Sequence, residues 1–162
     1  LFLSAVKIDV REQCAADPDY AVTVADVEAF ERRHGRIPQQ SMVIIWTGWE
    51  SRWGTPAFPN TDAAGVMHQP GFAVETAQWL VDTGRIGHTG GTGTDTFGPD
   101  LGTDASYAVS RLVHRQHRIS LEILANLAAL PAAGAQVLCG GAVNRAGSGS
   151  TAIVYGVLPA GH

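Results

Sequence analysis

The spacing of apolar and polar residues divides the chain into short strands and helices. Residues 6–10 alternate apolar and polar side chains, as a strand with one buried face does. Residues 42–46 are an uninterrupted apolar run, which predicts a strand buried on both faces. Near the C-terminus, residues 135–139 and 151–158 also predict strands.

Three segments show the apolar spacing of a helix. The first begins after Thr23, whose side chain is expected to cap the helix together with Asp26, and it is expected to end at Gly35 in the left-handed conformation. The second covers residues 75–82, and the third covers residues 107–116. Because strands alternate with helices, the sequence predicts an α/β fold.

Three other segments are predicted to be less regular. Residues 11–20 are predicted to be irregular, and residues 122–127 are predicted to form a short helical turn. Residues 55–70 form a long loop with three prolines, and loops of this length in a compact domain are commonly functional. A chain of 162 residues with 45% hydrophobic content suits one domain over residues 1–162.

Composition and charge exclude some partners. Charged residues make up 16% of the chain and the net charge is -4, without a Lys/Arg cluster, so no nucleic-acid partner is expected. No apolar run approaches membrane-spanning length, so no membrane partner is expected. Cys14 and Cys139 form no disulfide framework, and they predict reduced thiols in a cytoplasmic protein.

Tryptophans are concentrated after the buried strand of residues 42–46. Trp46, Trp49 and Trp53 fall within eight residues. They are interpreted either as packing over the end of the sheet or as an aromatic wall for a flat organic ligand. Trp46 is expected to belong more to the core, and Trp49 more to the wall. In the long loop, His68 is the main polar candidate, although a single His more often has a structural role.

Two carboxylates are candidates for a site. The glycines before Asp95 predict a strand that approaches its neighbours closely and delivers Asp95 to its end. Glu122 stands at the head of an apolar block, where a carboxylate is costly to bury without a partner. The structural alternatives are a turn cap for Asp95 and a helix-start carboxylate for Glu122.

Segments spread in order along nearly the whole chain resemble the metal-dependent cyclase family, which includes bacterial kynurenine formamidases and isatin hydrolases. The segments that carry the resemblance are Val-Lys-Ile-Asp-Val, Thr-Val-Ala-Asp-Val-Glu-Ala-Phe-Glu, Gly-Arg-Ile-Pro, Ile-Ile-Trp-Thr-Gly-Trp, His-Gln-Pro-Gly-Phe, Gly-Thr-Asp-Thr, Leu-Glu-Ile-Leu-Ala-Asn-Leu, Leu-Pro and Gly-Ser-Gly-Ser.

The resemblance implies a swivelling β/β/α fold with a mixed sheet and flanking helices. It implies hydrolysis of an amide, formamide or lactam C–N bond, with a small aromatic amide as the ligand and a place in tryptophan catabolism. It also implies a divalent metal, zinc or manganese, which lowers the pKa of bound water and polarises the carbonyl under attack.

The chain departs from the family at the metal ligands. The family motif His-x-Gly-Thr-His-x-Asp lies before the first matched strand. We therefore expect this sequence, which begins at Leu1, to be the C-terminal part of a longer chain and to be N-terminally incomplete. The family also has a His followed twelve residues later by a Glu. Glu122 matches that Glu as a metal ligand, but Ser110 stands at the position of the His, and His114 could substitute only with a shift of register. This chain alone is expected to lack a full ligand set, or to bind no metal.

Two functional hypotheses follow from the resemblance. In the first, the chain is part of a hydrolase in which Glu122 is a metal ligand or an acid/base catalyst. Trp46, Trp49 and His68 then line the substrate pocket, and Asp95 orients polar groups.

The second hypothesis is a non-catalytic relative that binds a small molecule or a partner, which Ser110 favours. Under either hypothesis, unpaired sheet edges predict a homo-oligomer, most simply a two-fold dimer.

Overall fold

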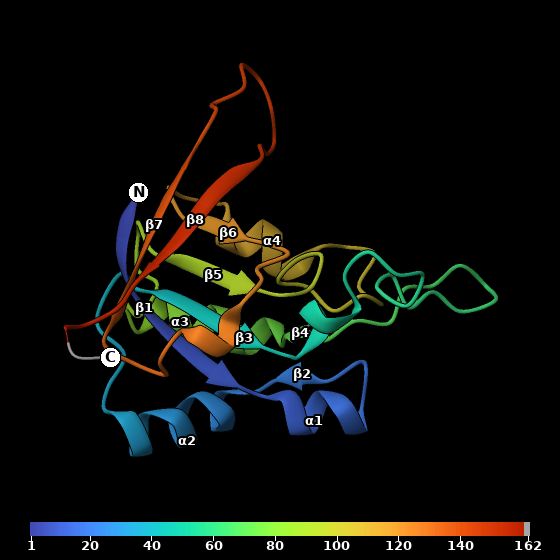
Figure 1. Cartoon of the computed structure of the whole chain (residues 1–162), viewed down its shortest axis with the longest axis horizontal. Coiled ribbons are helices and arrows are strands. Elements are labelled where there is room, and N and C mark those ends of the chain that lie inside the picture. The colour runs from blue at the N-terminus through green and yellow to red at the C-terminus, as the bar shows by residue number, and fades with distance from the viewer. Residues whose placement is uncertain (161–162) are drawn as a thin grey trace.

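One mixed sheet of six strands forms the centre of the molecule (Figure 1). The computed structural model describes residues 1–160. Within them, the strand order across the sheet is β6-β5-β3-β1-β7-β8. Strands β1, β3, β5 and β6 run parallel, whereas β7 and β8 run antiparallel to their neighbours. The bounds of these strands are Phe2–Asp9 (β1), Met42–Trp46 (β3), Gly91–Thr94 (β5), Ile119–Leu121 (β6), Ala135–Gly141 (β7) and Ala152–Val157 (β8).

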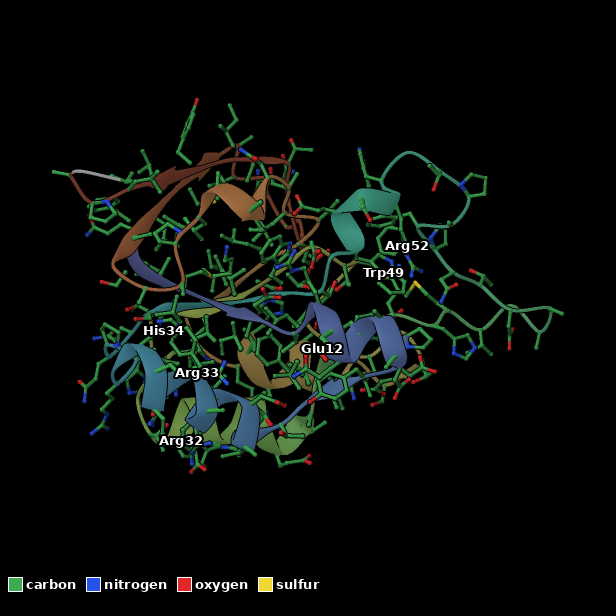
Figure 2. All side chains as sticks on the ribbon, turned by 60° about the horizontal axis from the view of Figure 1, so that its bottom comes forward. Glu12, Arg32, Arg33, His34, Trp49 and Arg52 are labelled. Atoms are coloured by element: carbon green, nitrogen blue, oxygen red, sulfur yellow. The ribbon has the colours of Figure 1, made fainter. Side chains whose placement is uncertain are left out.

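The two faces of the sheet are covered differently. The α-helices lie on one side of the parallel strands β1, β3, β5 and β6. The 3-10 helix η2 and the antiparallel end of the sheet, the β7–β8 hairpin, lie on the other side (Figure 2). The helices are α1 (Arg11–Ala16), α2 (Val24–His34), α3 (Val74–Asp82) and α4 (Ala108–Val113), and the 3-10 helices are η1 (Trp49–Arg52) and η2 (Leu127–Ala129). The short strands β2 (Ala21–Val22) and β4 (Gly71–Phe72) pair with each other in parallel beside the main sheet.

Strand β3 explains how both faces are filled from one run of sequence. Successive side chains of a strand point to opposite faces. Val43 and Ile45 pack into the core under the helices, whereas Met42 and Ile44 pack into the second core under the hairpin. All four side chains are buried, as the uninterrupted apolar run predicted.

Much of the predicted element order is confirmed. Helix α2 begins with a capping box in which the Thr23 hydroxyl accepts from the Asp26 N–H and the Asp26 carboxylate accepts from the Thr23 N–H. The helix ends at Gly35, but Gly35 has φ 86° and ψ 166°, so its φ is positive while its ψ is extended. The expected left-handed ending is therefore corrected.

Two predicted segments differ from the structure. Residues 11–20, predicted to be irregular, contain helix α1, which buries Cys14. Residues 122–126 form no helical turn, and the 3-10 helix η2 begins only at Leu127. Instead, the Leu124 N–H donates to the carbonyl of Thr94 at the end of β5, and the Ile123 N–H donates to the carbonyl of Thr96 just beyond it. These bonds to another segment replace local helical bonds.

Within the described residues, none of the helices combines the length and the apolar character that a membrane crossing requires.

Gly71 marks a close approach of two segments near the sheet. A Cβ at this position would lie 2.4 Å from the backbone carbon of Asp100 and 2.5 Å from its oxygen. A backbone neighbour cannot rotate away as a side chain can. Gly71 therefore fixes the distance between β4 and the segment that follows β5.

We predict that Gly71→Ala lowers the free energy of unfolding by about 1–3 kcal/mol, because the added methyl overpacks a buried contact. Urea denaturation followed by tryptophan fluorescence measures this loss. Gly140→Ala is the matched control, since a Cβ there meets nothing within 4 Å. Equal midpoints for the two variants would contradict the assignment.

Candidate functional site

The carboxyl ends of four parallel strands meet at one edge of the sheet. Asp9 ends β1 and Trp46 ends β3, while Asp95 and Glu122 directly follow β5 and β6. The register pairs Asp9 with Trp46, Ile45 with Thr94, and Gly93 with Leu121, so these ends are neighbours. In α/β sheets, ligands bind in the crevice outside this edge. The candidate site therefore lies at this edge.

Asp95 is fully buried and holds the turn after β3. One carboxylate oxygen accepts from the Thr47 N–H at 3.0 Å and the Thr47 hydroxyl at 2.8 Å, and the other accepts from the Glu50 N–H at 3.1 Å. Burial raises the pKa of the Asp95 carboxyl, against the opposing effect of these donors. Asp95 thus orients backbone groups of the protein, as its turn-cap interpretation expects. The expectation that Asp95 also orients polar groups in a substrate pocket stays a prediction.

Trp46 is half-buried and contacts two cations. The Lys7 Nζ lies 4.2 Å from the ring centroid, and the Arg11 guanidinium carbon lies 3.5 Å from it. Its indole N–H donates to the Glu50 carboxylate at 3.0 Å, and the other Glu50 oxygen accepts from the Leu127 N–H at 3.4 Å. Glu50 therefore joins the end of β3 to the segment that follows Glu122.

Trp49 belongs to the core, although it was expected to belong more to an aromatic wall, whereas Trp46 packs against the core as expected. Only 1% of Trp49 is exposed, and its indole N–H donates to the Phe58 carbonyl at 2.8 Å. The Arg52 guanidinium lies 3.7 Å from the ring centroid (Figure 2). Gly48 has φ 82°, which turns the chain back after β3 and points Trp49 inward. Such a placement argues against Trp49 as a wall for a ligand.

His68 lies between two carboxylates. Its Nδ1 is 2.7 Å from an oxygen of Asp19, and its Nε2 is 3.5 Å from an oxygen of Asp62. The hydrogen bond to Asp19 contributes most to raising the pKa of His68. Nδ1 is therefore engaged by Asp19, while Nε2 faces Asp62 at a distance longer than a hydrogen bond.

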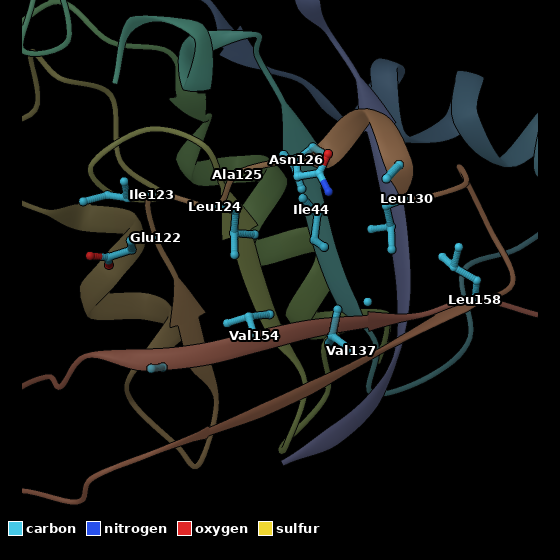
Figure 3. Close-up of a pocket in the computed structure, with 14 residues that line it drawn as sticks. Ile44, Glu122, Ile123, Leu124, Ala125, Asn126, Leu130, Val137, Val154 and Leu158 are labelled. Carbon is cyan, nitrogen blue, oxygen red and sulfur yellow. The ribbon is translucent and has the colours of Figure 1, made fainter. Parts of the chain in front are cut away.

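Glu122 is solvent-accessible and lines two cavities. One has a volume of about 430 Å³ and lies between the sheet and the β7–β8 hairpin, with Ile44 and Leu124 facing Val137 and Val154 (Figure 3). The other has a volume of about 480 Å³. Its lining residues are Gly65, Val66, Met67, Phe97, Gly98, Asp100, Leu101, Gly102, Thr103, Asp104, Ala105, Tyr107, Ser110 and Glu122. We call this second space the Glu122 cavity.

The carboxylate of Glu122 is partly desolvated despite its contact with solvent. Desolvation contributes most to raising the pKa of Glu122, and the charge of Asp100 raises it further. The nearby Ser120 hydroxyl and His114 act in the opposite direction. His114, the predicted substitute ligand, is exposed at the end of α4 and acts on Glu122 through its charge.

Ser110, at the position where the family has a His, is paired with Asp100. Its hydroxyl donates to Asp100, which also accepts from the Val109 N–H at 2.6 Å and the Ser110 N–H at 3.1 Å. Asp100 therefore caps the start of α4 and orients the Ser110 hydroxyl within the Glu122 cavity. The sequence interpretation did not identify Asp100 as a site residue.

Two aromatic side chains of the Glu122 cavity were also missed. Phe97 is 40% exposed and Tyr107 is 64% exposed, and both line the cavity. Tyr107 has φ 54°, a conformation that its residue type does not predict. The available signal was two aromatic residues flanking Asp100 in a glycine-rich segment, close in sequence to Glu122.

The described residues do not by themselves fit a divalent metal. Among residues 1–160, no group of three or more His, Cys, Asp or Glu side chains is placed to hold a metal ion. Protein metal sites of this kind need at least three protein ligands. Glu122 is an accessible carboxylate donor, but a cation bound there would need donors from outside these residues.

Comparisons with known proteins agree on one family. A family model described as "Putative cyclase" matches residues 1–101. The isatin hydrolase of Roseibium aggregatum is 32% identical over 157 residues, which cover 94% of this chain and 58% of that protein.

Solved structures match the fold closely. A crystal structure of an isatin hydrolase bound to the product analogue thioisatinate has a TM-score of 0.89 and 31% identity, and the match covers 98% of this chain and 61% of that chain. Isatin hydrolase A from Ralstonia solanacearum has a TM-score of 0.89 and 34% identity, and the match covers 98% of this chain and 60% of that chain. This chain therefore spans about three fifths of the length of the relatives that it matches.

We predict that Asp95→Asn lowers the free energy of unfolding by about 1–3 kcal/mol, because the new amide NH₂ faces a buried N–H donor that it cannot satisfy. Thermal or urea denaturation measures the change. Asp82→Asn is the control, since Asp82 is exposed and accepts one hydrogen bond from Gln78. If Asp95→Asn is as stable as the wild type, Asp95 does not hold the turn.

Proposed function

Because the chain belongs to the cyclase family, we propose that it is part of a hydrolase that cleaves an amide, formamide or lactam C–N bond. The family match and the likeness to isatin hydrolases support this reaction class. The observation that carries the proposal is the position of Glu122, an accessible carboxylate that lines two cavities. The relatives are longer than this chain, so the activity is proposed for the whole protein.

Glu122 acts in this proposal as the acid/base residue. Hydrolysis forms a bond between the water oxygen and the carbonyl carbon and breaks the C–N bond. A base must take a proton from the water, and an acid must give a proton to the leaving nitrogen. One carboxylate can do both in turn, and Glu122 lies where water reaches it. The products are a carboxylate and an amine.

The Glu122 cavity supports a small aromatic amide as the substrate. Its volume of about 480 Å³ lies in the usual range of small-molecule pockets. Phe97 and Tyr107 provide aromatic surface for a flat ring. Trp46, His68 and Asp95 are proposed to support this site by holding the surrounding backbone, since each is engaged with protein partners.

A divalent metal, zinc or manganese, is proposed as the cofactor, and the alternative role of Glu122 is to be one of its ligands in place of the acid/base role. The remaining donors would come from another segment or another chain, because the described residues do not complete a site. When bound, such a cation activates water and polarises a carbonyl.

A cytoplasmic setting, one domain over residues 1–162 and a place in tryptophan catabolism complete the proposal. The two free cysteines support a reducing compartment. Burial raises the pKa of the Cys14 thiol to about 12, so this thiol stays protonated and inert.

We predict that Glu122→Gln lowers kcat/KM for opening of the isatin lactam or of an aryl formamide by about 10²–10⁴-fold, the usual range for loss of an acid/base group. Two proteins are assayed: residues 1–162, and the same residues preceded by whatever the reading frame encodes upstream of them. Zinc or manganese is added to both assays. Loss of the substrate absorbance measures the rate.

Glu75→Gln is the matched control, because Glu75 is exposed at the start of α3. Full activity of Glu122→Gln would remove Glu122 from the mechanism. Binding of the lactam without turnover in either form of the protein would favour the non-catalytic alternative.

A homo-oligomer, most simply a dimer, is proposed to form through the β7–β8 hairpin. Strand β8 is an edge of the sheet, and residues 135–158 contain a single charged residue, Arg145. Phe2, Leu138 and Tyr155 are paired in register across three strands, with exposed fractions of 55%, 43% and 59%. Edge strands that stay unpaired are usually protected by charges, so this one is suited to a partner strand.

The exposed area also supports a partner. A compact monomer of 17.1 kDa is expected to expose about 7,800 Å², whereas this chain exposes 8663 Å². The excess of roughly 900 Å² is close to the 800 Å² or so that each partner buries in a standard interface. A second copy is the simplest partner, because a two-fold axis pairs identical edges.

We predict that Ile153→Lys and Tyr155→Lys convert a dimer to a monomer in light scattering, because each places a charge on the exposed face or edge of β8. Val143→Lys is the control, since Val143 is 98% exposed in the loop between β7 and β8. A wild-type protein that scatters as a monodisperse monomer would rule out this interface.

A further inference from the structure

Residues 60–68 form a small hairpin within the long loop between η1 and β4. The backbone N–H of His68 donates to the Asn60 carbonyl at 3.1 Å, and the Asn60 side chain donates to the His68 carbonyl at 2.7 Å. Thr61 and Met67, which are one residue closer to the tip, form an antiparallel bridge. We call residues 60–68 the loop hairpin.

The tip of the loop hairpin is closed by Asp62. One oxygen of its carboxylate accepts from the N–H groups of Ala64 and Val66 at 2.8 and 2.9 Å. The other oxygen lies 3.5 Å from Nε2 of His68. Asp62 therefore contacts both the tip of the loop hairpin and the imidazole at its base.

The loop hairpin forms one wall of the Glu122 cavity. Gly65, Val66 and Met67 line this cavity together with Glu122. At the base of the hairpin, the Gly102 N–H donates to the Gln69 carbonyl at 2.8 Å. A Cβ on Gly102 would lie 2.8 Å from the Met67 oxygen, so the two backbones are in close contact. The position of the hairpin thus sets the shape of the cavity.

His68 connects the loop hairpin to a different part of the chain. Its Nδ1 lies 2.7 Å from Asp19, which belongs to the turn between α1 and β2. The charged groups that face the ring are Asp19 from that turn and Asp62 from the hairpin itself. A carboxylate accepts hydrogen bonds and cannot donate them, and only the imidazolium ring donates from both nitrogens. Nδ1 alone is within hydrogen-bond distance of a carboxylate, whereas Nε2 is 3.5 Å from Asp62. Protonation of the ring therefore adds the attraction of a positive charge for both carboxylates.

We propose that His68 is a positioning residue whose imidazolium form fastens the loop hairpin to Asp19 more tightly than its neutral form does, and so sets the wall of the Glu122 cavity. This assigns His68 a role through the loop and not through contact with substrate. Its consequence for catalysis rests on the proposed function, whereas the fastening of the loop hairpin does not.

The direction of the pH dependence follows from the charge. The two carboxylates raise the pKa of His68, whose ordinary value is about 6.5. A raised pKa means that the fastened hairpin binds a proton more tightly than the released one. The stabilisation is therefore fully present below the ordinary pKa of histidine and is lost as the pH rises through the raised value.

Hydrogen exchange of the loop hairpin tests the proposal. The N–H groups of Asp62, Gly65, Val66 and His68 are hydrogen-bonded within the hairpin and report its opening. After correction for the intrinsic pH dependence of exchange, protection is expected to fall with rising pH, in step with the His68 titration followed by NMR. The fall is about tenfold for each unit by which the pKa of His68 is raised.

Four variants separate charge from structure. His68→Gln is expected to lack the extra protection at every pH, and Asp19→Asn to bring the titration of His68 back toward its ordinary pKa. His68→Lys keeps a positive charge and is expected to retain protection above neutral pH. His117→Gln is the matched control, because His117 is exposed and is far from the loop hairpin in the sequence. Unchanged exchange of β1 and β3 amides verifies that each variant is folded.

Two results would overturn the proposal. One is equal exchange of the hairpin amides in His68→Gln and the wild type. The other is exchange that does not follow the titration of His68. If the protein proves to be a hydrolase, His68→Gln should raise KM more than it lowers kcat. A lack of hydrolysis would refute the proposed function and leave the exchange result to decide the role of His68.

Discussion

The buried carboxylate of Asp95 is the interaction on which the site depends. A buried charge is tolerated only when donors surround it, and Asp95 receives three, from Thr47 and Glu50. These bonds fix the turn after β3 and hence the Glu50 side chain. Glu50 in turn binds the indole of Trp46 and the backbone of Leu127. The end of β5 is thereby connected to the segment after Glu122, so one buried group orders the whole edge of the sheet.

The parallel strands explain why the functional groups meet there. Four strands run in the same direction, and the residues that follow them are forced to a common edge. Helices cover one face of the sheet, whereas the hairpin and η2 cover the other and leave a cavity of about 430 Å³ beneath them. Glu122 lies at the end of this face and lines both the 430 Å³ cavity and the Glu122 cavity. Glu122 lines both cavities because it directly follows β6 at the edge of the sheet.

Local sequence was sufficient for elements whose stability is local. The Thr23 capping box and the apolar run of β3 are properties of a few consecutive residues, and both were predicted. The residues directly after Glu122 were predicted wrongly as helical, because their conformation comes from bonds to Thr94 at the end of β5 and to Thr96 beyond it. The pairing of Asp100 with Ser110 was missed for a related reason, since its residues are ten apart and meet only when α4 forms.

The carboxylates of the region also differ in how they are held. Asp95 and Asp100 accept from backbone N–H groups in fixed geometry, and Glu50 bridges two segments. Such groups are structural, because their lone pairs are committed to the fold. Glu122 instead opens on solvent and on two cavities, while its surroundings raise its pKa. A carboxylate that the fold exposes and partly desolvates, among others that it immobilises, is the one suited to exchange protons with a bound molecule.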